Sequence, residues 1–439
     1  MDRLIKNARI VTKSGVITGN IGINDGKIIS IGTETPHTAQ DVIDADGKIA
    51  MPGAIDVHTH MHDPDLFTPD ITFASETASA VAGGVTTVME LPTQSPMTTP
   101  EAIQEKIAAC SGKAHIDFKL VAGNFQSRNV NISGLQDCGV TDFKIFTSEP
   151  YQADNETIIE IMHSVAGSGG KIWAHCETQS ILDYAKRQIS SNNPEIYPDS
   201  RPIEAEVDAI TRIGEFARIT ECPVHIVHIT SGRGATVARQ YKRHNNAQIT
   251  LETCPQYLAF SRTDVEKKGP FLKVNPGLRS EKQRELLWNA VIDGTIDLIA
   301  TDHFPVMRED RKEGWNDIWD PYAGVPGVET MVEYLVSKGV HMDRISWQRL
   351  AELICENPAR EAGIYPQKGS LAIGSDADIM LIDETTYEVS ADECTFVGEW
   401  TPFEGQKWSA RVDLVLLNGD ICARRHTVLN EPGDGSYLQ

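Results

Sequence analysis

The sequence predicts an α/β protein in which a (β/α)₈ barrel carries a small β-sandwich built from both ends of the chain. The middle of the chain alternates short apolar runs with longer amphipathic stretches, which is typical of strands and helices that alternate around a parallel sheet. Both ends instead alternate apolar and polar residues around turn-forming residues, as short antiparallel strands do. We therefore expect a discontinuous sandwich at 1–52 and 364–439, and the barrel at 53–363.

The predicted sandwich rests on turn signals near both termini. Asn24-Asp25-Gly26 and Asp46-Gly47 punctuate alternating apolar runs at the N-terminal end. A similar pattern returns late in the chain, at Ala377–Ile382 and Val412–Gly419. Two strand-rich ends that flank a different middle are expected to pair with each other.

The predicted barrel rests on eight apolar runs that alternate with amphipathic stretches. These runs lie at 54–58, 85–89, 116–121, 142–146, 171–175, 224–228, 248–253 and 297–301. Eight parallel strands with intervening helices close into a barrel, whose catalytic groups lie at the carboxyl ends of the strands.

Composition excludes several classes of partner. The 439 residues carry a net charge of −22, which argues against nucleic acid or an anionic membrane surface. No apolar run approaches the roughly 18 residues of a membrane span, and the first residues lack the apolar core of a signal peptide. The eight cysteines show no CxxC spacing and are expected to be reduced thiols in a cytoplasmic protein. Cys176 is assigned a packing role.

The residues at the ends of the predicted strands are of metal-binding types. His58 and His60 are two residues apart, so on a strand both side chains would point the same way. The other strand ends supply His175, His228 and Asp302. Four imidazoles and a carboxylate on one rim of a barrel suit Zn²⁺ or a similar divalent ion.

Each residue alone has a simpler explanation. A single histidine at a strand end is more often a hydrogen-bonded structural residue, and His225, near His228, shows how such residues accumulate. Asp302 alone could cap a helix. Lys144 lies inside an apolar strand, where an ammonium needs a carboxylate partner, a depressed pKa or a chemical modification. Taken together, these positions predict a metal site.

Several motifs resemble those of the amidohydrolase superfamily, in the branch of dihydroorotases, allantoinases and hydantoinases. Beside His58-x-His60, the matching segments are Gly83–Thr87, Lys273–Arg279, Ala300–His303 and Glu356–Ala359. The resemblance covers nearly the whole chain, including the split β-sandwich.

This resemblance implies two divalent metal ions, with Zn²⁺ the expected metal, and a Lys144 whose Nζ is carboxylated. His58, His60 and Asp302 would hold one ion and His175 with His228 the other, while carboxylated Lys144 bridges them. A hydroxide shared by the metals would attack a ring carbonyl, and Asp302 would carry the proton to the leaving nitrogen. The resemblance also implies a small cyclic amide or ureide as substrate, and a homotetramer or dimer.

The choice of substrate is narrowed by positions at which this sequence differs from dihydroorotases and hydantoinases. Dihydroorotases carry an arginine where this chain has His62, an Asn-Thr pair where it has Thr93-Gln94, and a histidine near the position of Met307. These differences argue against dihydroorotate. Hydantoinases usually carry a tyrosine at the position of Glu149, while Tyr151 lies two residues further on.

Allantoinases share more features with this chain. Their counterparts here are Glu90-Leu91-Pro92, Arg201-Pro202 with Glu206, Trp288, and Ala410-Arg411, although His62-Asp63-Pro64-Asp65 departs from their pattern. We expect hydrolysis of allantoin to allantoate, a step of purine catabolism. The alternatives are hydantoins or dihydropyrimidines, another cyclic imide or lactam, and a non-enzymatic scaffold on the same fold.

The resemblance also suggests residues that contact the substrate ring. They are His62, Thr93, Asn275, Gly277, His303, Pro326 and Gly327. The segment 307–322 is rich in charged and aromatic residues and has two interpretations. It could close over the site as a lid, or it could be a surface loop whose tryptophans pack on the barrel.

Overall fold

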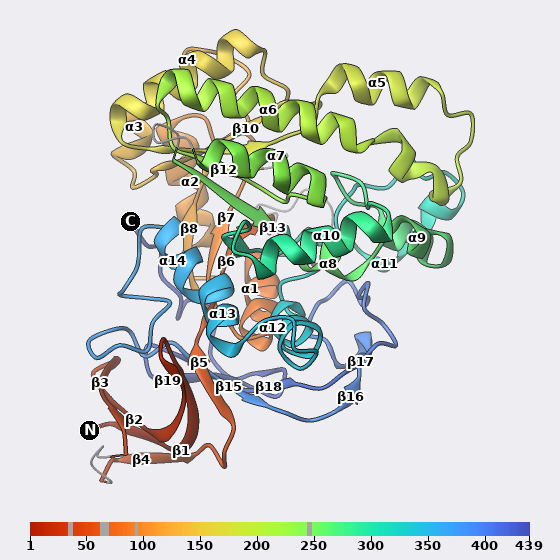
Figure 1. Cartoon of the computed structure of the whole chain (residues 1–439). Helices are drawn as coiled ribbons and strands as arrows, with labels where there is room; N and C mark the ends of the chain where they lie inside the picture. The colour runs from red at the N-terminus through yellow and green to blue at the C-terminus, as the bar shows by residue number, and fades with distance from the viewer. Residues whose placement is uncertain (34–37, 62–69, 93–94, 244–247) are drawn as a thin grey trace.

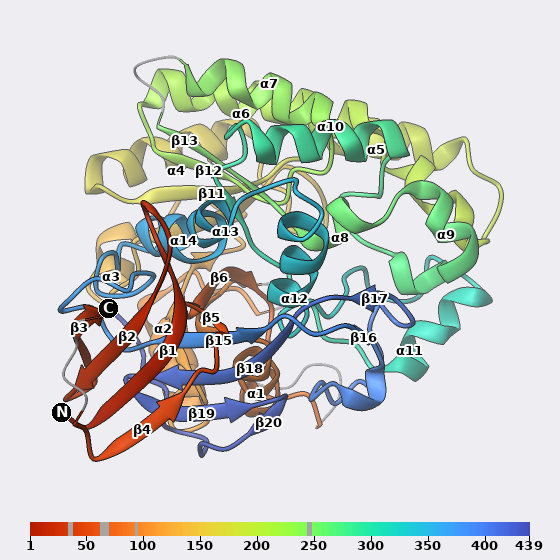
Figure 2. The same cartoon turned by 60° about the horizontal axis from the view of Figure 1, so that its bottom comes forward.

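The computed structural model describes residues 1–33, 38–61, 70–92, 95–243 and 248–439. Both ends of the chain meet in one sheet (Figures 1 and 2). Its N-terminal strands are β1 (Arg3–Thr12), β2 (Gly15–Asn24), β3 (Lys27–Gly32), β4 (Asp41–Asp44) and β5 (Ile49–Pro52). Its C-terminal strands are β15 (Ile379–Asp383), β18 (Arg411–Leu417), β19 (Asp420–Arg424) and β20 (Thr427–Val428). The order is β20-β19-β18-β15-β5-β1-β2-β3, with β4 paired to β1.

The two ends of the chain are joined where β5 pairs with β15. This pairing is antiparallel, with Ala50 opposite Leu381. Isoleucines and leucines from both ends, among them Ile10, Ile21, Ile379 and Leu414, form one buried cluster under the sheet. The predicted union of the two ends is therefore confirmed.

All eight predicted barrel strands are present. They are β6 (Ala54–Thr59), β7 (Val85–Glu90), β8 (Asp117–Leu120), β10 (Asp142–Phe146), β11 (Lys171–His175), β12 (Val224–Ile226), β13 (Ile249–Thr253) and β14 (Leu298–Ile299). Neighbouring strands pair in parallel, and the short β9 (Ala122–Gly123) continues β8 to reach β10. A parallel bridge between Thr59 and His303 brings the first strand beside the last. The predicted (β/α)₈ barrel is confirmed.

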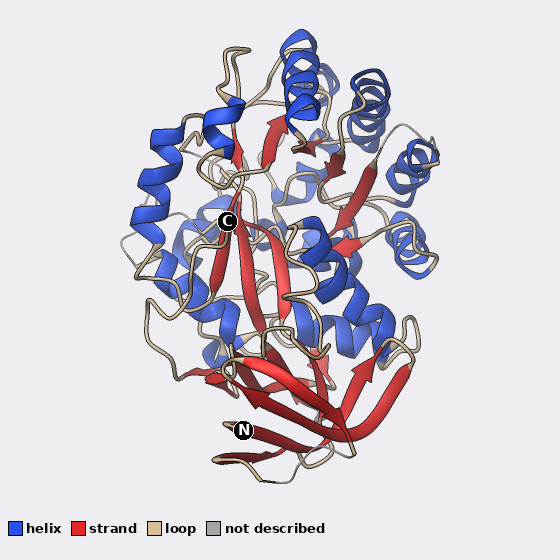
Figure 3. Cartoon of the chain, turned by 90° about the vertical axis from the view of Figure 1, so that its left-hand side faces the viewer, coloured by secondary structure: helices blue, strands red, loops and turns tan. Residues whose placement is uncertain are grey.

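Helices surround the barrel strands (Figure 3). The α-helices are α1 (Phe73–Ala82), α2 (Pro100–Cys110), α3 (Ile132–Gln136), α4 (Asn155–Ser168), α5 (Gln179–Arg187), α6 (Ile203–Thr220), α7 (Gly232–Lys242), α8 (Pro255–Ala259), α9 (Arg262–Lys268), α10 (Glu281–Ile292), α11 (Arg308–Lys312), α12 (Met331–Leu335), α13 (Trp347–Ala351) and α14 (Asn357–Glu361). Single π turns at Val336–Val340 and Glu352–Glu356 extend α12 and α13, and a 3₁₀ turn spans Pro194–Ser200.

Helix α4 shows how the local sequence defines these elements. The Asp154 side chain accepts a hydrogen bond from the Thr157 amide and caps the first turn. Gly169 ends the helix at φ 77°, a left-handed conformation that glycine adopts without a steric cost. Between these caps, Ile158, Ile161 and other apolar residues at helical spacing face the barrel core.

Part of the C-terminal region packs on the barrel rather than joining the terminal sheet. Here β16 (Tyr387–Glu388) pairs with β17 (Lys407–Trp408), and Phe403 stacks against Phe260. The last residues follow β8, where the Phe118 amide donates to the Ser436 carbonyl and the Leu438 amide to that of Phe118. The proposed boundaries at residues 52 and 364 stay a prediction.

Two buried ionic clusters connect these C-terminal segments with the barrel. The ammonium of Lys368 contacts Asp117 of β8 at 2.6 Å and Asp378 at 2.7 Å. His426 donates to two carboxylates, from Nδ1 to Glu329 at 2.9 Å and from Nε2 to Glu333 at 3.0 Å. Burial alone would lower the pKa of His426, but these two carboxylates raise it to about 10.

Two further expectations concern the whole chain. Among the described residues, no helix is both long and apolar enough to cross a membrane. All eight cysteines are free thiols. Cys176 is buried beside His175 and its Sγ contacts the Ala174 carbonyl, in keeping with a packing role.

Candidate functional site

The carboxyl ends of the barrel strands enclose a pocket of about 130 Å³. Six side chains from five strand ends, all predicted as metal ligands, line it: His58, His60, Lys144, His175, His228 and Asp302. The barrel brings them together because parallel strands direct their carboxyl ends to one rim.

Three of these side chains converge on one point. Nε2 of His58 lies 3.3 Å from Oδ1 of Asp302, and Nε2 of His60 lies 3.2 Å from the same oxygen. The opposite ring nitrogens are held from behind, Nδ1 of His58 by Glu252 at 2.8 Å and Nδ1 of His60 by the Leu91 carbonyl at 3.0 Å. Burial opposes ionisation of Asp302, but the neighbouring imidazoles lower its pKa overall, so this carboxylate is charged.

A second pair of imidazoles lies on the other side of the pocket floor. Nδ1 of His175 faces Nε2 of His228 at 3.0 Å, while Nε2 of His175 bonds the Glu177 carboxylate at 2.9 Å. Nδ1 of His228 is buried and has no hydrogen-bond partner among the described residues. Burial lowers the pKa of both rings. Neutral imidazoles whose ring nitrogens meet in a pocket are suited to binding a cation.

Lys144 lies close to His58, His60 and Asp302, the first group of predicted ligands. Its Nζ is 3.5 Å from Nε2 of His58 and lies over the Phe146 ring at 5.2 Å. The side chain is 1% exposed, and no carboxylate among the described residues lies within 4 Å of its Nζ. Burial lowers the pKa of Lys144 to about 8. The structure therefore contains the buried strand lysine that the sequence predicts.

Two buried glutamates that sequence reasoning missed hold these ligands in place. Glu252 accepts from Nδ1 of His58 and, through the same oxygen, from the His228 amide at 2.9 Å. Glu177 bonds His175 and is held by Arg201, whose Nε lies 3.1 Å away. Burial would raise the pKa of Glu177, but Arg201 and His175 lower it to about 2. A carboxylate inside the predicted strand run 248–253 was the available signal for Glu252.

The pocket wall combines aromatic and polar groups. The ring of Phe146 contacts that of Tyr151, 5.2 Å away between centroids and tilted by 56°, and the ring of Phe304 lies 6.1 Å from that of His60. Polar lining residues are Ser148, Glu149, Arg201 and Asn275, and the backbone of Ala323 and Gly324 completes the wall.

The predicted substrate-binding residues are only partly at this wall. Asn275 lines the pocket and accepts from the Tyr197 hydroxyl at 2.7 Å. His303 is buried behind it, where Nε2 bonds Glu76 at 2.8 Å and Nδ1 accepts from the Gly327 amide at 3.1 Å. Pro326 and Gly327 line a separate small cavity, and Gly277 packs against Pro198 and Arg201. His62 and Thr93 lie outside the described residues, and the substrate role of all seven stays a prediction.

The segment 307–322 folds against the barrel. It begins with α11, Trp315 packs over Gly269, and Trp319 lies 5.8 Å from the Tyr197 ring. The Tyr322 side chain is 53% exposed, and its ring lies 6.4 Å from that of Phe304, which lines the pocket. The tryptophans thus pack on the barrel, and movement of this segment as a lid stays a hypothesis.

Most features that favoured allantoin have structural roles. The Glu90 carboxylate accepts from the Met61 amide at 2.8 Å, and Glu206 accepts from the Thr230 amide at 2.7 Å. The Trp288 indole donates to the Leu258 carbonyl at 3.0 Å. Of these features, Arg201 lines the pocket.

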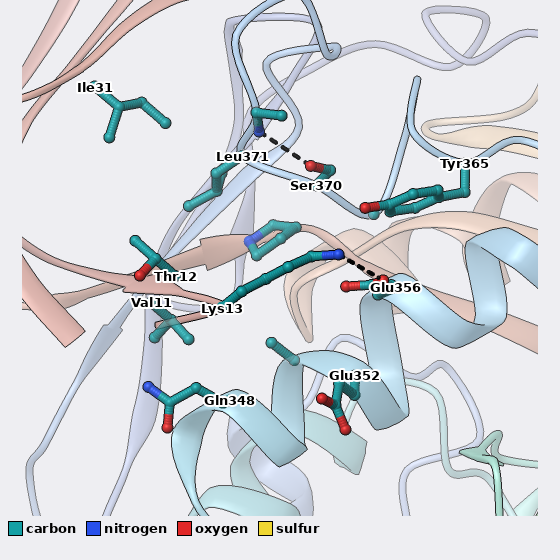
Figure 4. Close-up of a pocket in the computed structure, with 14 residues that line it drawn as sticks. Val11, Thr12, Lys13, Ile31, Gln348, Glu352, Glu356, Tyr365, Ser370 and Leu371 are labelled. Carbon is teal, nitrogen blue, oxygen red and sulfur yellow. Dashed lines mark hydrogen bonds and ion pairs between the residues drawn. The ribbon is translucent and has the colours of Figure 1, made fainter. Parts of the chain in front are cut away.

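A larger cavity of about 420 Å³ lies between the terminal sheet and α13 (Figure 4). Its walls combine aliphatic and polar side chains, and Lys13 pairs with Glu356 at 3.0 Å. None of its lining residues is a histidine, cysteine or aspartate. Because metal-ligand chemistry gathers in the smaller pocket, that pocket is the candidate active site.

Comparison with known proteins agrees with this geometry. The sequence profile of the amidohydrolase family matches residues 49–422. The chain is 32% identical to an L-hydantoinase of Paenarthrobacter aurescens, over 100% of this chain and 98% of that protein. It is 33% identical to an allantoinase of Rubrobacter xylanophilus, over 98% and 96% of the two chains.

Solved structures give the same fold. The structure of the L-hydantoinase (dihydropyrimidinase) from Arthrobacter aurescens superposes with a TM-score of 0.94 at 32% identity, covering 99% of both chains. Relatives with different substrate names are thus equally similar in sequence, so overall identity does not select the ring that is opened.

Proposed function

This chain belongs to the amidohydrolase family, in the branch of cyclic amidohydrolases, and we propose that it opens the ring of a cyclic ureide in a metal-dependent reaction. Allantoin, hydrolysed to allantoate, is the proposed substrate. The observation that carries this proposal is the convergence of His58, His60 and Asp302 beside the facing pair of His175 and His228.

The donor set fits two divalent cations, which we propose to be Zn²⁺. His58, His60 and Asp302 would hold one, and Nδ1 of His175 with Nε2 of His228 would hold the other. Lys144 would bridge them after its Nζ is carboxylated, which would replace a buried, unpaired ammonium with an anionic ligand. Such ions, when bound, lower the pKa of water and polarise a carbonyl oxygen.

The chain's own residues would then position groups and move a proton. Glu252 and Glu177 hold the imidazole rings from behind, which fixes the nitrogen that each presents to the pocket. The Asp302 carboxylate is held charged and would accept the proton lost by the attacking water. It would return that proton to the ring nitrogen as the bond between this nitrogen and the carbonyl carbon breaks.

The substituent on the ring separates two candidate substrates. Allantoin and the hydantoins share a five-membered ring, and allantoin carries a polar ureido group on it. Ser148, Glu149 and Asn275 in the pocket wall support a polar substituent. The aromatic side chains of Phe146, Tyr151 and Phe304 favour a second candidate, a hydantoin with an apolar substituent.

We further propose that the enzyme is cytoplasmic and works as a homo-oligomer, either a dimer or a tetramer. A non-enzymatic scaffold on this fold is less favoured, because all six ligand positions hold competent residues that meet in one pocket. About two metal equivalents per chain would argue against a scaffold.

The test is ring opening by Zn²⁺-loaded protein with bicarbonate present. The panel is allantoin, hydantoin, 5-benzylhydantoin, dihydrouracil, dihydroorotate and succinimide, with Asp302→Asn as the inactive control. Preference for allantoin would support the main proposal, and preference for 5-benzylhydantoin would replace it with the second candidate. If the protein binds metal but opens none of these rings, the proposed reaction is wrong.

A further inference from the structure

Two buried cations near the pocket have no acidic partner. Lys273 is 5% exposed and Arg311, in α11, is 0% exposed. Among the described residues, no carboxylate lies within 4 Å of the charged nitrogens of either side chain. Burying a cation without a carboxylate is costly, so other polar groups must satisfy these two side chains.

Both cations donate to carbonyls of one short turn, Trp319–Gly324. Nζ of Lys273 donates to the Trp319 carbonyl at 3.3 Å and also to that of Pro321. The guanidinium of Arg311 donates from Nη1 to the Tyr322 carbonyl and from Nη2 to that of Gly324. Four carbonyls of six consecutive residues are thus fixed by two side chains.

The backbone and two rings strengthen this arrangement. The Gly324 amide donates to the Lys273 carbonyl at 2.9 Å, so the turn and the lysine are bonded in both directions. Lys273 lies over the Tyr197 ring at 5.0 Å, and Arg311 over the Trp400 ring at 5.3 Å. Burial, followed by repulsion from Arg311 and Arg201, lowers the pKa of Lys273 to about 7.

The turn held in this way is part of the pocket wall. Ala323 and Gly324 line the pocket. Gly324 lies so close to Phe304 that a Cβ on this glycine would be 2.3 Å from Cβ of Phe304. Phe304 in turn lies 6.1 Å from the ring of His60, so a shift of the turn changes the space above the metal-ligand side chains.

We propose that Lys273 and Arg311 are positioning residues that clamp the Trp319–Gly324 turn and thereby set the room for the ring substituent of the substrate. Arg311 suits this task because hydrogen bonds from a charged donor to carbonyls are stronger than those from a neutral group, and Lys273 donates from an ammonium below its pKa of about 7. The structural part of this inference stands without the proposed function, and its consequence for substrate choice rests on that function.

The clamp is tested first without activity, by hydrogen–deuterium exchange over residues 316–326. In Lys273→Met and Arg311→Met we expect these amides to exchange at least about tenfold faster than in the wild type, because the turn opens locally. Lys312→Met is the matched control, since Lys312 lies on the same helix but is 45% exposed and pairs with Glu309. Exchange in this segment equal to that of the wild type would overturn the clamp.

A conservative variant separates the geometry of the clamp from its charge. Arg311→Lys keeps the cation but loses the fork of donors that reaches two carbonyls, so we expect intermediate exchange. If either methionine variant fails to fold, exchange in Arg311→Lys still tests the clamp. Wild-type exchange in Arg311→Lys would show that the fork is not needed and would contradict the proposed geometry.

The consequence for substrate choice is measured as a ratio. We expect the ratio of kcat/KM for 5-benzylhydantoin to that for unsubstituted hydantoin to change by at least about tenfold in the clamp variants and not in Lys312→Met. An unchanged ratio with faster exchange would refute the role in specificity. If the wild type opens neither of these rings nor allantoin, the proposed function fails while the exchange comparison still decides the clamp.

Discussion

Lys144→Met is the substitution that tests the candidate metal centre most directly. Methionine is close to lysine in length and removes the charge, so the packing of this 1% exposed side chain is retained. In the proposed centre, loss of the bridging group would leave three protein ligands for one ion but only two, His175 and His228, for the other. The second ion should therefore be lost first.

The expected loss of metal affinity follows from the number of ligands that remain. Residues that only support metal ligands are worth about 10–100-fold in metal affinity, so losing a shared ligand should cost at least about 100-fold. We expect about two metal ions per chain in the wild type and one or fewer in Lys144→Met, measured by elemental analysis after gel filtration.

In metal-free protein, by contrast, Lys144→Met should not lower the free energy of unfolding. In metal-free protein, Lys144→Met removes a buried ammonium without a carboxylate partner, which should leave the free energy of unfolding unchanged or raise it by up to about 3 kcal/mol. Unfolding in urea is the suitable assay, because about 1 kcal/mol shifts the melting temperature of a chain this long by only about 1 °C. Added Zn²⁺ should stabilise the wild type more than the variant.

Lys119→Met supplies the matched control. Lys119 is a second buried lysine on a barrel strand, β8, and it does not line the pocket. This control should keep its metal. If Lys144→Met retains two metal ions and full activity, the bridging role assigned to Lys144 is wrong.

Further predictions concern the supports of the fold and the site. Lys368→Met leaves two buried aspartates, Asp117 and Asp378, without their cation, while Asp376 keeps its contact with Lys27. This variant should cost about 3–5 kcal/mol in urea unfolding, whereas the exposed control Lys13→Met should cost little; equal midpoints would contradict this. The pKa of His426 is raised from 6.5 to about 10 in the folded protein, so its stabilisation, on the order of 4 kcal/mol, is full below about pH 6.5 and lost as pH rises through about 10. His426→Gln should therefore flatten the fall in stability between pH 7 and 10, and an unchanged slope would exclude this residue as its source. Glu252→Gln should weaken metal binding by about 10–100-fold with an unchanged circular dichroism spectrum, because the amide holds Nδ1 of His58 less well; wild-type affinity would refute this support.

Sequence alone located the strands of the barrel and the residues at their ends. Strand periodicity placed His58 and His60 on one face, and the alternation of strands and helices placed His175, His228 and Asp302 on the same rim. These inferences succeed because the facing of a side chain is set by local backbone geometry, and because parallel strands can close only with their carboxyl ends together.

Tertiary structure decided which groups support that site. Glu252 reaches Nδ1 of His58 only when the barrel closes, because the two residues lie 194 positions apart in the chain. Glu177 lies two positions after His175, but the Arg201 that holds it comes from a more distant segment. Lys273 and Arg311 meet at a turn that lies about 50 residues further along the chain than the lysine. His303 turned out to hold the backbone behind the pocket. A local pattern specifies an element and the direction of its side chains, whereas hydrogen-bond partners depend on the packing of distant segments, which no local pattern records.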